Sequence, residues 1–358
     1  MQPGKFMKQS WERDYSKSWA QPGTFVAMMQ AKKEPMPERP YPAYENYRRS
    51  LKGEQPYWIP FRSIDVETVW PDAIDEHPVP EVDGFDWWGV DWVMEPNVGG
   101  MITRPGTRTI SDFANWKEEL EWPDISGVDF EADGKKLSAN YDPNRYHQYE
   151  CVEGMFERLH ELIPFDESLL AFYEEPELLE EFFAKMIDYK IETTEKLLKY
   201  YGRVDGVCYH DDWGTEKDGF FSNEMFREQI MPQTKRYIDF LHANGLPVEL
   251  HSCGRNTQYV PEMIEMGIDA WMPQYRCNDI DYLFDTYGDK MSFTVPLNIP
   301  ANAGDDEIRE IIKAYVERYG VHGNVVCSAM IRDKEKKAFV AEELFKISFE
   351  YYNKKYGR

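Results

Sequence analysis

Residues 247–254 read Pro-Val-Glu-Leu-His-Ser-Cys-Gly and place a histidine and a cysteine two positions apart, at His251 and Cys253. The apolar start of this segment predicts a β-strand, on which alternate side chains point to the same face. An imidazole and a thiol on one face are ligand types that zinc prefers. Cys327 follows another strand-like run, Gly-Asn-Val-Val, and offers a third soft ligand. We therefore predict a zinc site formed by His251, Cys253 and Cys327, with one position open for chemistry.

The chain has five cysteines, an odd number that argues against a disulfide framework. Cys277 competes with Cys327 as the third ligand, whereas Cys151 and Cys208 lack ligand spacing and are expected to lie in the core. The alternative to a metal site is a hydrogen-bonded core histidine beside a cysteine that packs as a small hydrophobic residue.

From about residue 150 onward, strand-like and helix-like segments alternate, which is typical of βα units around a parallel sheet. Strands are expected at 204–212, 247–254, 268–275, 291–300 and around Cys327, and helices at 175–200, 223–244, 259–266, 279–287, 304–319 and 335–355. Counted backwards, these strands are numbers four to eight of an eight-stranded α/β barrel, a (β/α)8 TIM barrel whose first strand lies near 57–61. We expect a partly helical extension at 1–50 and a barrel domain at 51–358, in which 65–145 form long loops over the mouth.

Active sites of such barrels lie at the C-terminal ends of the strands. Polar residues end several of the expected strands, and we predict roles for two groups of them. The catalytic candidates are Asp211 and Asp212, and the substrate-binding candidates are Tyr209, Gln274, Tyr275 and Asn298. Adjacent strand residues point to opposite faces, so one of the two aspartates is expected to reach the pocket, where an aromatic environment raises a carboxyl pKa enough for acid catalysis. The alternative for both aspartates is a solvated loop start or the N-terminal cap of a following turn.

Composition excludes several classes of partner. The chain has 358 residues, 65 acidic against 41 basic, and a formal net charge of −24. Such a charge disfavours nucleic acid and anionic membrane surfaces, which need basic footprints. There is no apolar run of the roughly 20 residues that span a bilayer, and the first ten residues lack an apolar signal core. We expect a soluble cytoplasmic protein.

Four stretches resemble the uroporphyrinogen decarboxylase superfamily and, within it, the cobalamin (corrinoid)-dependent methyltransferases of anaerobic microbes. They are Tyr209-His-Asp-Asp-Trp-Gly-Thr215, the helix start Ser222-Asn-Glu-Met-Phe, His251-Ser-Cys-Gly254 and Glu265-Met-Gly-Ile-Asp269. The resemblance covers residues 150–355 well and the N-terminal third loosely. It implies an α/β barrel and zinc held by a His-x-Cys…Cys set, which on this chain is His251, Cys253 and Cys327. The surroundings of Cys327, Val-Val-Cys-Ser-Ala-Met-Ile, lack the proline-rich context of the thiol-methylating members.

The resemblance implies two methyltransferase reactions. In the first, a small methylated substrate such as an aryl methyl ether gives its methyl group to the cobalt of a separate corrinoid protein, and zinc or an acid stabilises the leaving oxygen. In the second, the methyl group moves from methylated cobalt to a thiol such as coenzyme M. The aromatic content and the departure around Cys327 favour the first. In both, the corrinoid protein is expected to dock on the N-terminal loops, and the sequence leaves a monomer and a homodimer open.

Two other functions remain as alternatives. A true decarboxylase of this superfamily needs cationic groups for its many substrate carboxylates, and the expected first strand offers one candidate, Arg62. A noncatalytic, corrinoid-binding barrel is the other alternative, and the absence of zinc binding in a folded protein would favour it.

Overall fold

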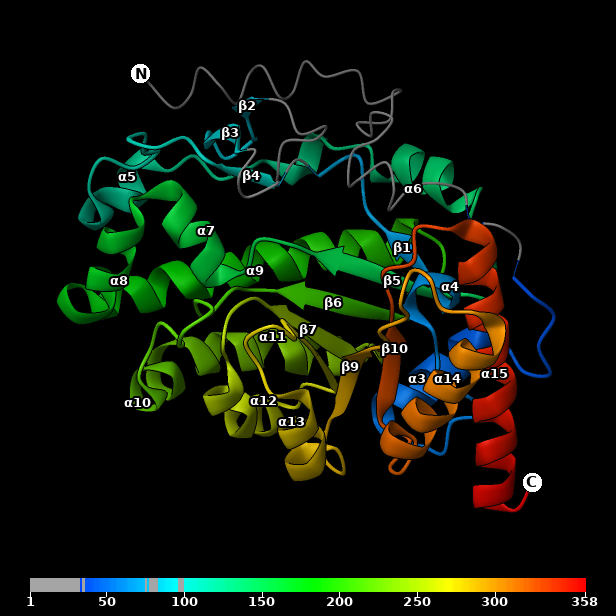
Figure 1. Ribbon diagram of the computed structural model, residues 1–358. Helices are drawn as coiled ribbons and strands as arrows, with labels where there is room; N and C mark the ends of the chain where they lie inside the picture. Colours follow the sequence, from blue (N-terminus) through cyan, green and yellow to red (C-terminus); the bar gives the residue numbers. More distant parts are fainter. Residues whose placement is uncertain (1–32, 34–35, 75, 77–82, 96–99) are drawn as a thin grey trace.

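The computed structural model of the 358-residue chain describes residue 33 and residues 36–358, except 75, 77–82 and 96–99 (Figure 1). Most of the expected extension at 1–50 therefore lies outside the described residues. The first described helix, α3 (Ala43–Lys52), ends in a left-handed cap at Gly53. No helix in the described part of the chain is long and apolar enough to cross a membrane.

Seven parallel strands form the central sheet, in the order β1-β5-β6-β7-β8-β9-β10. The strands are β1 (Val66–Val69), β5 (Tyr146–Cys151), β6 (Gly206–His210), β7 (Val248–Ser252), β8 (Ala270–Pro273), β9 (Ser292–Pro296) and β10 (Val325–Ser328). The last five correspond to the five strands expected from the sequence. The α/β class with a curled parallel sheet is confirmed.

The first strand of the expected barrel, near 57–61, is not formed as a strand, so the sheet of the described residues has seven strands instead of eight. Phe61 makes one isolated parallel bridge to Cys327 on β10, supported by a hydrogen bond from Cys327 N to Pro60 O at 2.7 Å. The one-turn helix α4 (Arg62–Asp65) follows at once and leads into β1, which pairs with β5. The short stretch from Pro60 to β1 thus joins the two edges of the sheet, β10 and β1. A further strand does not form there, because Pro60 has no backbone N–H to donate to the hydrogen-bond ladder.

Helices follow the strands in the βα order that the sequence predicts. They are α7 (Met155–Leu162), α8 (Phe165–Glu174), α9 (Pro176–Tyr200), α10 (Asn223–Met225), a π-helical turn (Phe226–Ile230), α11 (Met231–Ala243), α12 (Val260–Met266), α13 (Ile280–Tyr287), α14 (Asp305–Tyr319) and α15 (Lys334–Tyr356). Local signals set their ends: Pro176 lies in the first turn of α9, Ser222 accepts from Met225 N at the start of α10, and Gly267 ends α12 in the left-handed region.

Residues 65–145, expected to be long loops, contain regular structure as well. A three-stranded antiparallel sheet consists of β2 (Gly84–Phe85), β3 (Asp91–Glu95) and β4 (Gly100–Thr103). Two short helices, α5 (Trp116–Glu119) and α6 (Phe130–Ser138), follow it. Three tryptophans of this region, Trp87, Trp88 and Trp92, are buried, which accounts for its aromatic richness.

The interior of the sheet changes from apolar to polar along the strands. Helix α3 covers the N-terminal end of the sheet interior. Its Tyr47 and Leu51 pack there against Tyr146, Ala270 and Val326. Because alternate strand residues share a face, the next inward positions lie toward the C-terminal ends, and there they are polar. In Figure 1 the arrows of β5 and β6 point toward this end. The fold therefore gathers its inward polar side chains where a barrel enzyme has its active site.

Candidate metal centre

A histidine, a cysteine and an aspartate converge at the C-terminal end of β7. Asp212, His251 and Cys253 each offer one ligand atom, and these atoms lie within 4.8 Å of one another. Cys253 Sγ lies 3.4 Å from His251 Nε2. All three side chains are half-buried. The His-x-Cys pair is thus brought together as the strand spacing predicts, with Asp212 from the end of β6 as its neighbour.

The turn after β7 is held by hydrogen bonds from both sides. Asp212 Oδ1 accepts from Cys253 N at 2.5 Å, and Gln274 Oε1 accepts from Gly254 N at 2.8 Å. Gly254 has φ +91°, and a Cβ there would lie 2.2 Å from the backbone of Gly214. A side chain at position 254 is therefore excluded both by backbone conformation and by space.

His251 is suited to act as a neutral ligand. Burial, and next the neighbouring His210, lower its pKa to about 4, so the ring is uncharged at neutral pH. Its buried Nδ1 has no hydrogen-bond partner among the described residues. Burial and then Asp212 raise the pKa of the Cys253 thiol, so a nearby cation is needed to form the thiolate.

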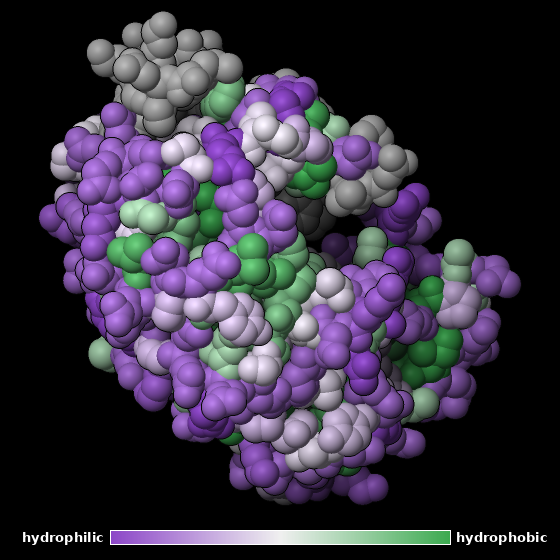
Figure 2. Space-filling model, turned by 90° about the vertical axis from the view of Figure 1, so that its left-hand side faces the viewer, coloured by the Kyte–Doolittle hydropathy of each residue, from purple (hydrophilic) through white to green (hydrophobic). Residues whose placement is uncertain are grey.

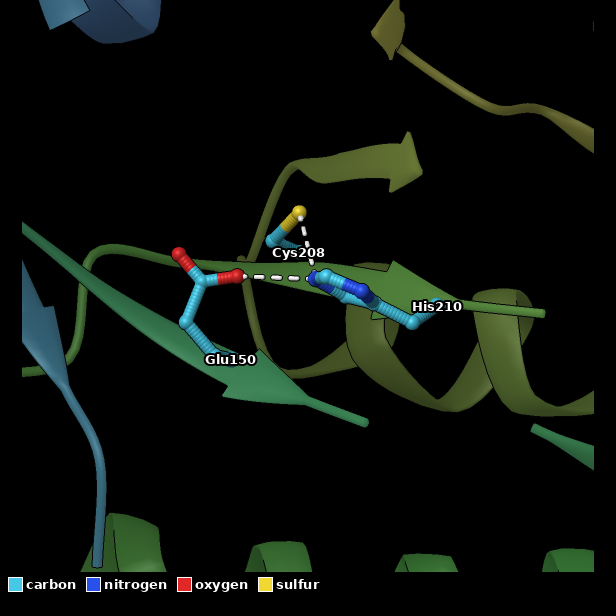
Figure 3. Close-up of side chains that lie close together, drawn as sticks. All are labelled: Glu150, Cys208 and His210. Atoms are coloured by element: carbon cyan, nitrogen blue, oxygen red, sulfur yellow. Dashed lines mark hydrogen bonds and ion pairs between the residues drawn. The ribbon is translucent and has the colours of Figure 1, made fainter. Parts of the chain in front are cut away.

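A second group of possible ligands lies directly beside the first. Glu150 of β5 and Cys208 and His210 of β6 also have ligand atoms within 4.8 Å of one another. His210 Nε2 lies 3.0 Å from Glu150 Oε2 and 3.5 Å from Cys208 Sγ. Figure 3 shows how the three side chains point toward one another. The rings of His210 and His251 are 4.8 Å apart between centroids, so the two groups share a boundary.

A half-buried arginine, Arg62, joins two buried strand carboxylates next to these groups. Arg62 donates to Glu150 Oε1 at 3.0 Å and to Glu249 Oε2. Glu249 is fully buried, and it also accepts from Gln148 Nε2 at 2.9 Å and from Thr294 Oγ1 at 2.6 Å. These bonds compensate for the removal of the Glu249 charge from water.

A cavity of about 510 Å³ opens next to His251. Most of its lining is apolar, from Met272, Pro273, Pro296, Leu297, Ile299, Pro300, Ala329 and Met330, and its polar groups come from Gln274, Tyr275, Thr294, Asn298 and Ser328. Figure 2 views the molecule from the side toward which β5 and β6 point and shows a hollowed face with hydrophobic side chains among hydrophilic ones. The arrangement suits a small, largely apolar ligand.

Residues 155–328 match the model of the uroporphyrinogen decarboxylase (URO-D) family. This match covers just under half of the chain. Among solved structures, this chain is similar to a methyltransferase from Methanosarcina mazei, with a TM-score of 0.61, 11% identity and coverage of 87% of this chain and 99% of that one. At this identity, the similarity establishes a shared fold. A family 10 endo-β-1,4-xylanase from Gloeophyllum trabeum gives a TM-score of 0.36, with 11% identity and coverage of 64% and 82%. None of the curated proteins matches the chain.

The structure places the predicted substrate-binding residues on two different faces. Gln274, Tyr275 and Asn298 line the cavity together with His251. Tyr209, in contrast, is fully buried and its hydroxyl accepts from Met155 N at 3.3 Å, at the start of α7. The assignment of Tyr209 to the pocket is wrong, because odd-numbered residues of β6 face the helices.

The two predicted catalytic aspartates also face different sides, one the ligand group and the other the helices. Asp212 joins the ligand group, whereas Asp211 is fully buried and its Oδ1 accepts from Phe156 N at 3.1 Å and Glu157 N at 3.0 Å. Asp211 therefore satisfies free N–H groups in the first turn of α7, a helix that precedes it in the chain, rather than those of a following turn.

Replacing Asp211 with asparagine is expected to change how stability depends on pH. Burial raises the pKa of Asp211 to about 7. Since the unfolded chain loses this proton near pH 4, the folded protein holds more protons between pH 4 and 7, and its stability falls as pH rises through that window. Asparagine keeps the acceptor oxygen and does not titrate. From pH 5 to pH 8 the variant should gain about 2 to 3 kcal/mol in free energy of unfolding relative to the wild type.

Urea denaturation of both proteins at pH 5 and pH 8, under identical metal conditions, measures this difference. Asn223→Asp, an exposed position at the start of α10, controls for the general effect of one carboxylate on pH dependence. A constant difference between Asp211→Asn and the wild type across this range would contradict a buried, protonated Asp211.

Cys327 lies outside both ligand groups. Its thiol is fully buried beside the Tyr315 hydroxyl of α14, and its neighbours Val326 and Ser328 are the β10 residues that face inward. The competing thiol, Cys277, lies 3.4 Å from the backbone oxygen of Gln274. The prediction of Cys327 as third ligand is therefore contradicted, because the register of β10 turns it to the helix side.

The sequence analysis missed Glu150, Cys208, His210 and Glu249. A signal for two of them was present, since Cys208-x-His210 has the same alternate spacing as His251-x-Cys253 and ends the neighbouring strand. Cys208 was assigned to the core, and its burial agrees with that. Its inward direction depends on the register of β6, which composition alone does not fix.

Proposed function

We propose that this chain is a member of the uroporphyrinogen decarboxylase superfamily and a zinc-dependent methyltransferase that moves a methyl group from a small methylated substrate, such as an aryl methyl ether, to the cobalt of a corrinoid protein. The observation that carries the proposal is the Asp212, His251 and Cys253 group beside a largely apolar cavity. The fold shared with a methyltransferase from Methanosarcina mazei supports the same class of reaction.

The donor set fits zinc. A thiol, an imidazole and a carboxylate are ordinary zinc ligands, and three protein ligands leave a position for substrate. The unpartnered Nδ1 of His251 and the uncharged state of its ring agree with ligation at either nitrogen. Bound there, zinc would supply a Lewis acid for the oxygen that leaves when the methyl group is transferred.

The cavity favours a neutral methyl ether over the anionic alternatives. Among the described residues that line it, none is lysine or arginine. The sulfonate of coenzyme M and the carboxylates of a tetrapyrrole would therefore lack a cationic partner here. Gln274 and Asn298 offer amide groups that can orient a neutral oxygen substituent, while Met272 and Leu297 contact an aromatic ring.

The reaction balances with one proton. The electron pair of reduced cobalt, Co(I), forms the cobalt–carbon bond, the carbon–oxygen bond breaks, and the phenoxide takes a proton from solvent. The apolar walls exclude water from the methyl carbon, and His251 and Gln274 border the space in which the leaving oxygen forms. Cobalt must approach from outside, so the partner docks over the C-terminal ends of the strands.

An anaerobic assay with zinc-loaded protein, cob(I)alamin and 2-methoxyphenol tests the proposal. We expect enzyme-dependent conversion of cob(I)alamin to methylcobalamin, followed by absorbance, and release of catechol. Methyl transfer from methylcobalamin to 2-mercaptoethanesulfonate, with none from methyl ethers, would reverse the assigned direction. Tight corrinoid binding without either transfer would instead favour the noncatalytic barrel.

A further inference from the structure

The second ligand group brings a carboxylate, a thiol and an imidazole together from two neighbouring strands. His210 Nε2 faces Glu150 Oε2 at 3.0 Å and Cys208 Sγ at 3.5 Å. The Cys208 thiol also hydrogen-bonds to Glu150, so the carboxylate is the common partner of the thiol and the imidazole. A cation between the three atoms could be bound by all of them, since each is an electron-pair donor after the thiol loses its proton.

Arg62 holds the carboxylate in place for such a cation. It binds Glu150 through Oε1, which leaves Oε2 directed at His210 (Figure 3). Burial alone would raise the pKa of Glu150, but Arg62 and His210 outweigh burial and lower it, so the group is ionised at neutral pH. Ligands in metal sites are oriented by outer partners of this kind.

We propose that Glu150, Cys208 and His210 bind a second divalent metal ion of the zinc class, beside the ion that the proposed function assigns to Asp212, His251 and Cys253. The 4.8 Å between the rings of His210 and His251 makes the two sites neighbours. A cysteine, a histidine and a carboxylate select borderline metals such as Zn²⁺ or Co²⁺ over Mg²⁺ or Ca²⁺. The second site needs no part of the methyl-transfer proposal.

The charges of the region balance with two ions. With both ions bound, the anionic ligands would be the carboxylates of Glu150 and Asp212 and the thiolates of Cys208 and Cys253, with the Glu249 carboxylate beside them on Arg62. Two divalent ions and Arg62 match them. With one ion the region would retain either excess negative charge or a protonated thiol in contact with carboxylates, and buried charge without compensation is costly.

Cobalt loading with cysteine variants tests the proposal. Protein freed of metal with chelator is reloaded anaerobically with Co²⁺, and bound cobalt and thiolate-to-cobalt charge-transfer absorbance are measured. We expect two equivalents in the wild type and one in Cys208→Ser, with the absorbance halved. Cys151→Ser changes a buried cysteine on β5 that lies outside both groups and should retain two equivalents.

The result separates this proposal from the proposed function. One equivalent in the wild type, kept in Cys208→Ser and lost in Cys253→Ser, would overturn the second site and leave the first intact. One equivalent lost in Cys208→Ser and kept in Cys253→Ser would support the Glu150 site and contradict zinc at Cys253. If circular dichroism finds Cys208→Ser unfolded, His210→Gln gives the same test from the imidazole side, and unchanged cobalt content there would overturn the proposal.

Discussion

Replacing Cys253 with alanine is expected to remove one equivalent of metal and to lower methyl transfer to cob(I)alamin by at least about 10²-fold, whereas Cys327→Ala should leave both unchanged. Cys253 Sγ lies 3.4 Å from His251 Nε2 in the Asp212 group, but the Cys327 thiol faces Tyr315 of α14. Loss of a Lewis acid worth several kcal/mol at a leaving oxygen corresponds to at least this change in rate.

The two alanine variants form a matched pair, because both remove one sulfur from a strand of the same sheet. Zinc content by elemental analysis and the rate with 2-methoxyphenol are compared for each, with circular dichroism as the test of folding. Loss of metal in Cys327→Ala with retention in Cys253→Ala would restore the ligand set predicted from the sequence and require a different register for β10. Full activity in Cys253→Ala after metal loss would exclude zinc from the reaction.

Periodicity was sufficient to predict the second half of the fold. Helix 175–200 is found as Pro176–Tyr200, and the expected helix 335–355 as Lys334–Tyr356, because both carry long apolar repeats and clear end signals. The prediction of a first strand near 57–61 was wrong for a local reason. Pro60 and the immediate turn into α4 leave Phe61 with a single bridge, so an apolar run there does not become a strand.

The sequence predicts which site residues share a face of one strand. It predicts less well which residues of different strands lie together. The spacing of His251 and Cys253 fixes their common face, whatever the rest of the sheet does. The positions of Cys327 and Tyr209 depend instead on strand register, and a shift of one residue exchanges the inner and outer faces. The carboxylate partner of the ligand pair, Asp212, was named as a catalytic acid, since the sequence does not reveal that it closes the turn onto Cys253 N.

Replacing Arg62 with methionine is expected to destabilise the protein by about 3 to 5 kcal/mol. Arg62 is the cationic partner of both Glu249 and Glu150, and the side chain of Glu249 is fully buried. Methionine has a similar length and removes the charge, so the cost comes from two carboxylates left in the interior rather than from a large cavity. Urea denaturation in the presence of chelator measures the free energy of unfolding without a contribution from metal.

The double variant Arg62→Met, Glu249→Gln separates charge from packing. Glutamine removes the uncompensated charge, and it can still accept from Thr294 Oγ1. The Oε1 of Gln148 has no partner among the described residues, so a flip of this amide lets it accept from the new glutamine. We expect the double variant to recover at least about half of the loss, because removing both charges of a buried pair is far less costly than removing one.

Arg104→Met is the matched surface control. Arg104 pairs with Asp91 at 2.9 Å, but its side chain is 39% exposed, and exposed ion pairs contribute about 0 to 1 kcal/mol. A loss of less than about 1 kcal/mol in Arg62→Met, equal to that of Arg104→Met, would contradict a desolvated charge network at the base of the metal centre. A large loss that Glu249→Gln does not relieve would assign the role of Arg62 to Glu150, and hence to the orientation of the second ligand group.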